Sequence, residues 1–133
     1  MALLTMARED DGMAERVCFV LQVRPDRLAE YRLRHASVWP SMLEAIAESG
    51  RRNYSLFLRD DGTLIGYYET YDDKASQAIL ESNPVTGAWE AEMAEFFTDL
   101  SGRPDQAAPR VPEVFNLADA RAFARNDPRS PGR

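Results

Sequence analysis

The feature that most constrains the fold is a β-hairpin signal near the middle of the chain. Asp60-Asp61-Gly62 lies between two segments of aromatic and aliphatic residues, 53–59 and 63–71. Glycine tolerates the positive φ that a tight hairpin turn requires, so the two segments are predicted to pair as antiparallel strands. The fold must therefore contain an antiparallel sheet with this hairpin inside it.

The other periodic segments complete an alternation of strands and helices. In chain order they are a central strand at 16–23, a helix at 27–48, helices at 74–81 and 84–100, and an edge strand at 111–117. The order β-α-β-β-α-β predicts an α+β protein of the ferredoxin-like, split βαβ type, with a four-stranded antiparallel sheet and helices on one face. Tyr and Phe side chains would leave the other face apolar, so we expect two chains to cover it as a homodimer.

Length and composition predict one domain and exclude several partners. We expect a flexible leader at 1–14, a folded domain at 15–117 and a polar tail at 118–133. A net charge of −6 argues against nucleic acid and anionic membranes, because both require clustered basic residues. No apolar run approaches the roughly 18 residues of a membrane span, and no signal peptide is recognised, so we expect a cytoplasmic protein. One cysteine and one histidine exclude a His/Cys-rich metal site.

The predicted helix at 27–48 carries the one histidine of the chain. Tyr31 and His35 are four residues apart and share one helical face. Pro40 lacks an N–H and pushes Trp39 away from the α region, so we expect a break near residues 37–39. A broken helix with a titratable group just before the break predicts the wall of a small polar pocket.

These residues each have a structural and a functional interpretation. A histidine in an amphipathic helix is more often a packed or surface residue than a catalyst. Tyr31 and Trp89 are also typical core residues, and Tyr54 is a good strand former. Yet histidine is the one side chain whose ordinary pKa, about 6.5, allows proton exchange at neutral pH. From spacing and composition alone, both interpretations stay open.

A series of motifs nonetheless recurs in a recognisable order. They are V-x-P-D-x-x-x-E-Y-x-x-R-H-x-x-x-W-P at 23–40, Asn53-Tyr54, Asn83-Pro84-Val85, Trp89 with Met93, and Glu113-Val114-Phe115. Together they resemble the L-rhamnose mutarotase family over about residues 16–117. The resemblance implies a dimeric α+β barrel that interconverts the α and β anomers of L-rhamnose without a cofactor.

The resemblance also implies roles for individual residues. The family's proton-donating histidine falls on His35, and its sugar-contacting tyrosines fall on Tyr31 and Tyr54. A pair of adjacent tryptophans that contacts sugar in some members falls on Trp89 and Glu90, so an acid replaces the second aromatic ring. This departure leaves open whether the sugar is L-rhamnose, L-fucose or another 6-deoxy sugar.

The chemistry itself suits these residue types. Exchanging anomers requires removal of a proton from the anomeric hydroxyl and delivery of one to the ring oxygen, with no metal, redox centre or covalent intermediate. A histidine can carry the proton, tyrosine hydroxyls can bind sugar hydroxyls, and a tryptophan ring offers a flat face to the pyranose. Two hypotheses from other classes remain: a small dimeric-barrel monooxygenase that binds haem or acts on aromatic substrates, and a non-catalytic binding module.

Overall fold

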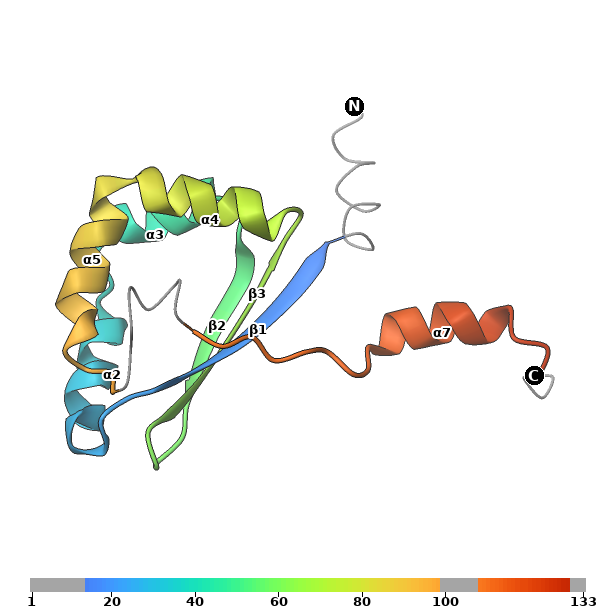
Figure 1. Cartoon of the computed structure of the whole chain (residues 1–133), viewed down its shortest axis with the longest axis horizontal. Helices are drawn as coiled ribbons and strands as arrows, with labels where there is room; N and C mark the ends of the chain where they lie inside the picture. The colour runs from blue at the N-terminus through green and yellow to red at the C-terminus, as the bar shows by residue number, and fades with distance from the viewer. Residues whose placement is uncertain (1–13, 99–107, 130–133) are drawn as a thin grey trace.

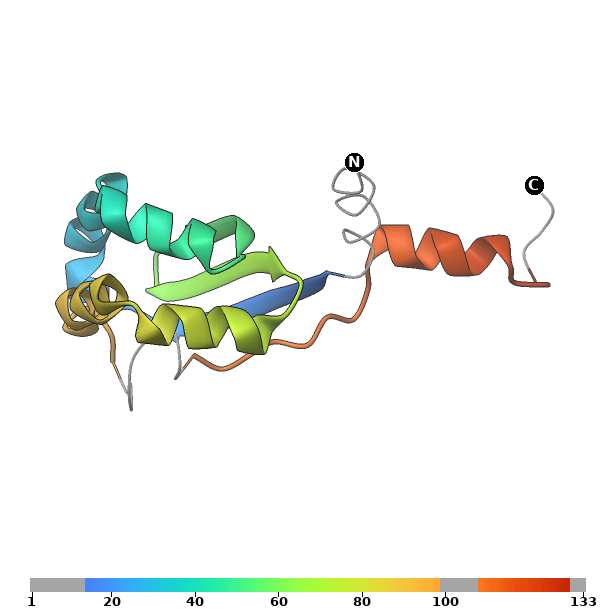
Figure 2. The ribbon, with the colours of Figure 1, turned by 90° about the horizontal axis from the view of Figure 1, so that it is seen from above.

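The computed structural model describes residues 14–98 and 108–129. Figures 1 and 2 show one layer of strands with helices α2 to α5 over one face, while α7 lies away from them. The elements in order are β1 (Glu15–Gln22), η1 (Pro25–Arg27), α2 (Leu28–Ala36), α3 (Pro40–Glu48), β2 (Arg52–Leu58), β3 (Thr63–Thr70), α4 (Asp73–Ser82), α5 (Pro84–Ala94) and α7 (Leu117–Arg125). The predicted α+β class with an antiparallel sheet is confirmed.

The sheet is centred on the return strand of the predicted hairpin. Its order is β1-β3-β2, and both pairings are antiparallel. Gly62 in the connecting turn has a φ of 93°, which is the conformation that favours glycine. Across the sheet, Gly66 of β3 pairs with Phe19 of β1. A Cβ on Gly66 would overlap the Phe19 ring, so only glycine leaves room for that aromatic side chain.

The prediction of a fourth strand at 111–117 is wrong for the described residues. Backbone pairing with β1 is limited to one isolated bridge between Phe19 and Arg110, flanked by the Val111 N–H, which donates to the Cys18 carbonyl oxygen at 2.9 Å. Within the described residues no further bridge to β1 follows this one. The sheet therefore has three strands within the described residues.

The segment predicted as a polar tail at 118–133 contains a helix. Residues Leu117–Arg125 form α7, and the Asn116 side chain caps the helix by accepting from the Asp119 N–H at 3.0 Å. Arg16 of β1 holds the approach to this helix through Glu113 at 2.7 Å and Asp119 at 2.6 Å. Residues 1–13 of the leader predicted at 1–14 lie outside the described residues, and the domain boundaries stay a prediction.

The predicted helix break is confirmed. Helix α2 ends at Ala36, and α3 begins with Pro40 at its first position. Between them Trp39 is extended, with φ −54° and ψ 133°, as expected for a residue before proline. The break lets α2 and α3 run in different directions (Figure 2). Residues of both helices line one cavity.

Candidate functional site

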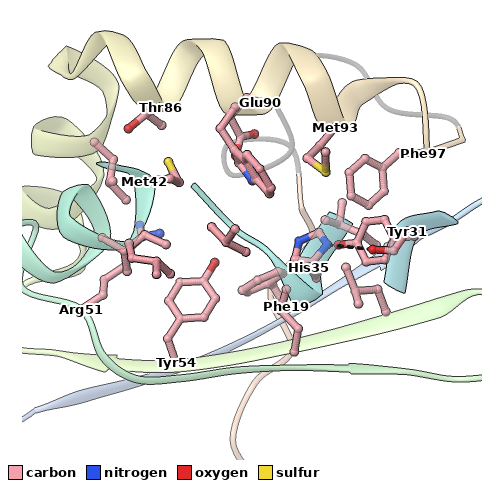
Figure 3. A pocket seen from close by; sticks show the side chains of 18 residues that line it. Phe19, Tyr31, His35, Met42, Arg51, Tyr54, Thr86, Glu90, Met93 and Phe97 are labelled. Atoms are coloured by element: carbon pink, nitrogen blue, oxygen red, sulfur yellow. Dashed lines mark hydrogen bonds between the residues drawn. The ribbon is translucent and has the colours of Figure 1, made fainter. Parts of the chain in front are cut away.

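A cavity of about 420 Å³ lies between the sheet and helices α2, α3 and α5. Figure 3 shows the side chains that surround it. Most are apolar, including Phe19, Leu21, Met42, Met93 and Phe97. The polar or titratable ones are Tyr31, His35, Arg51, Tyr54, Thr86 and Glu90. The volume falls in the range of about 300–1,000 Å³ that is typical of small-molecule sites.

All five residues that the sequence analysis singled out lie around this one cavity. Helix α2 supplies Tyr31 and His35, strand β2 supplies Tyr54, and helix α5 supplies Trp89 and Glu90. The three elements are far apart in the sequence, and the sheet and the helix break bring them together. Their roles toward a ligand remain predictions.

His35 is held by its own helix. Its Nδ1 lies 3.2 Å from the carbonyl oxygen of Tyr31. A carbonyl oxygen can only accept, so Nδ1 carries a hydrogen and donates it. In the neutral ring, Nε2 then keeps its lone pair. The Nε2 atom is therefore the nitrogen that can exchange a proton with a ligand.

Burial also sets the protonation state of His35. Removing the ring from water lowers its pKa below the ordinary value of 6.5, and the hydrogen bond to the Tyr31 backbone opposes this only in part. The ring packs against the Tyr31 ring at a tilt of 30°, with centroids 4.2 Å apart, and meets the Trp89 ring edge-on at 5.6 Å. The imidazole is therefore neutral and rigidly held at neutral pH.

Tyr31 is the most enclosed of the candidate sugar contacts, with 4 % of its surface exposed. Burial raises its pKa, and the nearby Tyr54 and Glu90 raise it further. The phenol therefore stays protonated at neutral pH and acts as a hydrogen-bond donor or acceptor rather than as a base.

A bulge in strand β2 directs Tyr54. Asn53 has a φ of 51°, in the left-handed region that asparagine tolerates better than most residues, and the register of β2 against β3 shifts between Arg52 and Ser55. The Asn53 side chain donates to Glu69 at 3.0 Å, which holds the bulge in place. Tyr54 then stacks on Tyr68 at 5.3 Å, and its hydroxyl points into the cavity (Figure 3).

Trp89 is both a core residue and part of the cavity wall. It is 7 % exposed and lines the cavity. Trp39, at the helix break, packs edge-on against the Trp89 ring with centroids 5.0 Å apart. Trp39 does not line the cavity. Arg34 also lies outside the lining and pairs with Glu92 at 2.7 Å. Trp39 is thus a packing anchor, and Arg34 is an ion-paired surface residue.

Two polar residues of the cavity, Arg51 and Thr86, were not among the site residues predicted from the sequence. The Arg51 guanidinium donates to Ser76 Oγ at 2.9 Å and Gln77 Oε1 at 2.8 Å, and lies 4.1 Å from the Tyr68 ring centroid. Arg51 lies in a loop, so no periodic pattern marks it. Thr86 precedes Glu90 by one helical turn, and that spacing could have indicated it. Its buried hydroxyl has no hydrogen-bond partner within the described parts of the chain.

Residues 14–98 and 108–129 contain no cluster of three or more His, Cys, Asp or Glu side chains that could hold a metal ion. Nor does any helix in these ranges have the length and apolar character needed to cross a membrane. The cavity is thus the site that the described chain offers for a small molecule.

The fold and the site define a small α+β protein of ferredoxin-like type, with a ligand cavity between its helices and its sheet. The sequence profile described as L-rhamnose mutarotase matches residues 16–117. The chain belongs to the L-rhamnose mutarotase family. Enzymes of that name are isomerases that act on carbohydrates.

Individual relatives agree with this assignment. An L-rhamnose mutarotase of Jannaschia sp. (strain CCS1) is 33 % identical over 104 residues, which cover 77 % of this chain and 98 % of the relative. One from Mesorhizobium japonicum is 29 % identical over 108 residues, covering 80 % of this chain and all of the relative.

Solved structures support the fold. The crystal structure of an L-rhamnose mutarotase from Formosa agariphila has a TM-score of 0.62 at 24 % identity, covering 77 % of this chain and 97 % of the other. A tetracenomycin F2 cyclase from Streptomyces glaucescens has a TM-score of 0.54 at 18 % identity, with the same coverage. At these identities the likeness shows a shared fold alone.

The environment of His35 predicts its titration. The chain has one histidine, so the imidazole signal in a proton NMR spectrum is unambiguous. We expect its midpoint below 6.5, because burial penalises the charged ring. The unfolded chain then binds more protons than the folded one, so the free energy of unfolding should decrease as pH falls below about 6.5 toward the folded pKa. A midpoint at or above 6.5 would contradict the described environment.

Proposed function

We propose that the chain interconverts the α and β anomers of L-rhamnose in this cavity by acid–base catalysis. The observation that carries the proposal is the position of His35, whose ring reaches a small-molecule cavity beside Trp89 and two tyrosines. Membership of the L-rhamnose mutarotase family gives the reaction and the sugar. The positions of the side chains around the cavity support a separate role for each residue.

Proton transfer falls to His35. Opening the pyranose removes the proton from the anomeric hydroxyl, forms the C1 carbonyl, breaks the bond from C1 to the ring oxygen and protonates that oxygen. Rotation about C1–C2 followed by closure gives the other anomer. A neutral imidazole with a free Nε2 takes up or returns such a proton near pH 7.

Sugar binding falls to the tyrosines and to Trp89. The protonated phenol of Tyr31 donates to a sugar oxygen from the helix side, and the Tyr54 hydroxyl does so from the sheet. The Trp89 ring offers an apolar face to the C–H side of the pyranose. Met42 and Met93 provide adaptable apolar surface, which suits the methyl group of a 6-deoxy sugar. L-fucose remains the alternative sugar.

No observation favours the other hypotheses. The likeness to a polyketide cyclase is one of fold, at 18 % identity. The monooxygenase and the binding module therefore have no support from the site, whereas the isomerase has support from the family and from the cavity. A cytoplasmic location remains a prediction from the sequence.

We also propose that the chain works as a homodimer, with a second copy covering the open face of the sheet. Apolar side chains form a row across this face, since Val20 pairs with Ile65 and Ile65 pairs with Phe57 on the third strand. Phe57 is 60 % exposed. Two such faces are self-complementary under two-fold symmetry, and their contact would remove the apolar row from water.

Replacing His35 with Asn should slow anomer exchange by about 10²–10⁴-fold, since the amide can form hydrogen bonds but cannot exchange a proton near pH 7. Saturation transfer between anomeric protons measures the rate for L-rhamnose, L-fucose and D-glucose. Tyr31→Phe is the matched control: it deletes one hydroxyl, keeps the ring, and should chiefly weaken sugar binding. Wild-type exchange in a folded His35→Asn protein would remove His35 from the mechanism.

The dimer can be tested by a charge in the centre of the open face. Light scattering should give the mass of two chains for the wild type, and Ile65→Asp should give the mass of one, because a buried unpaired carboxylate is strongly disfavoured. Leu33→Asp is the control, since Leu33 is 70 % exposed on α2 and lies outside that face. A wild-type monomer at micromolar concentration would contradict the proposal.

A further inference from the structure

The proposed reaction moves two protons, and His35 offers one nitrogen for them. Nδ1 of His35 is occupied by the carbonyl oxygen of Tyr31, which leaves Nε2. Ring opening takes a proton from the anomeric oxygen and delivers one to the ring oxygen. A second group that can gain and lose a proton would let both transfers take place without a charged sugar intermediate.

The cavity contains four other titratable or charged side chains, Tyr31, Arg51, Tyr54 and Glu90. The Arg51 guanidinium does not lose its proton in proteins. Tyr31 and Tyr54 are phenols, a class of group that titrates at about 10. Burial raises the pKa of Tyr31 further. A carboxyl group is the remaining side chain that can both accept and return a proton under ordinary conditions. Elimination therefore leaves Glu90.

The position of Glu90 agrees with this role. It is 9 % exposed, which is unusual for a carboxylate and sets it apart from the solvated acids of the surface. Its charge contributes to the raised pKa of Tyr31, so the carboxylate acts on the same space as that phenol. In Figure 3 Glu90 projects from α5 on one side, whereas His35 and the Tyr54 hydroxyl approach from the other sides.

Trp89, the neighbour of Glu90, packs helix α5 against helix α2. The Trp89 ring, next to Glu90 on α5, meets the His35 ring of α2 with centroids 5.6 Å apart. Helix α5 is also capped by Asn83, whose side chain accepts from the Val85 N–H at 3.0 Å. Both the carboxyl and the imidazole are thus carried on well-anchored helices that face the same cavity.

We propose that Glu90 is a second proton-transfer residue, acting with His35 on opposite oxygens of the hemiacetal. The inference rests on the proposed mutarotase function and deepens it. In ring opening, one of the two groups takes the proton from the anomeric oxygen while the other gives its proton to the ring oxygen, as the C1–O5 bond breaks and the C1 carbonyl forms. Ring closure reverses both transfers. The active form of the pair therefore holds one proton on either Nε2 or the carboxyl group, and it arises when the site with a neutral imidazole and a charged carboxylate takes up one proton.

This pair implies a bell-shaped pH dependence of anomer exchange. At low pH both groups hold protons and the base is lost, and at high pH neither does and the acid is lost. The two apparent pKa values belong to the pair, since Glu90, His35, Tyr31, Tyr54 and Arg51 all face the same space.

The test compares wild type, Glu90→Gln and Glu90→Ala by saturation transfer with L-rhamnose, beside a binding titration. Glu90→Gln keeps the shape and a hydrogen-bonding group but cannot titrate. We expect exchange at saturating sugar to fall by about 10²-fold or more, with sugar affinity changed far less and with one limb of the pH profile lost. Added formate should restore part of the exchange in Glu90→Ala by supplying a carboxylate, and this comparison covers the case in which the glutamine variant folds poorly.

The outcomes separate the two proposals. If wild type exchanges L-rhamnose and Glu90→Gln does so at the same rate, or loses rate only in proportion to affinity, Glu90 is a binding contact and the inference is overturned. Absence of rescue by formate in a folded Glu90→Ala protein would overturn it as well. If wild type itself exchanges no sugar in the panel, the proposed function fails, and the role of Glu90 fails with it.

Discussion

The hydrogen bond between His35 Nδ1 and the Tyr31 carbonyl oxygen is the interaction on which the site depends. It joins residues one turn apart on α2, so the helix itself orients the ring. It fixes the tautomer, and burial lowers the pKa of the same ring. A neutral imidazole with Nε2 free is what proton exchange with a sugar near neutrality requires. Without this bond, the ring could rotate and either nitrogen could face the cavity.

The rest of the fold surrounds that ring. The break at Trp39-Pro40 ends α2 directly after His35, and α3 then runs over the sheet as a second wall. The bulge at Asn53 directs Tyr54 from the sheet, and the Asn83 cap begins the helix that carries Trp89 and Glu90. The helix break, the bulge and the helix cap each depend on residues that are close together in the sequence. The cavity is the result of combining them on a three-stranded sheet.

That locality explains what could be predicted. Three short motifs determine the backbone conformation of the residues next to them, so the sequence alone predicts their effects. They are Asp60-Asp61-Gly62 for the hairpin, Trp39-Pro40 for the helix break and Asn83-Pro84 for the helix start. The five site residues were recognisable because their motifs resemble a known family. Arg51 was not, since its hydrogen bonds join it to Ser76 and Gln77 on α4, and no spacing reveals such contacts. Likewise, no local pattern reveals that the segment before α7 pairs with β1 through only one bridge within the described residues, so the expected fourth strand does not form there.

The central claim is that a sugar lies in the cavity with its anomeric centre at His35. The most direct measurement is an intermolecular nuclear Overhauser effect between L-rhamnose and the protein at an excess of sugar. The account predicts cross-peaks from the anomeric proton of the sugar to the ring proton of His35, and from other sugar protons to the Trp89 indole. Exchange of anomers by the protein with sugar contacts confined to residues outside the cavity would contradict it.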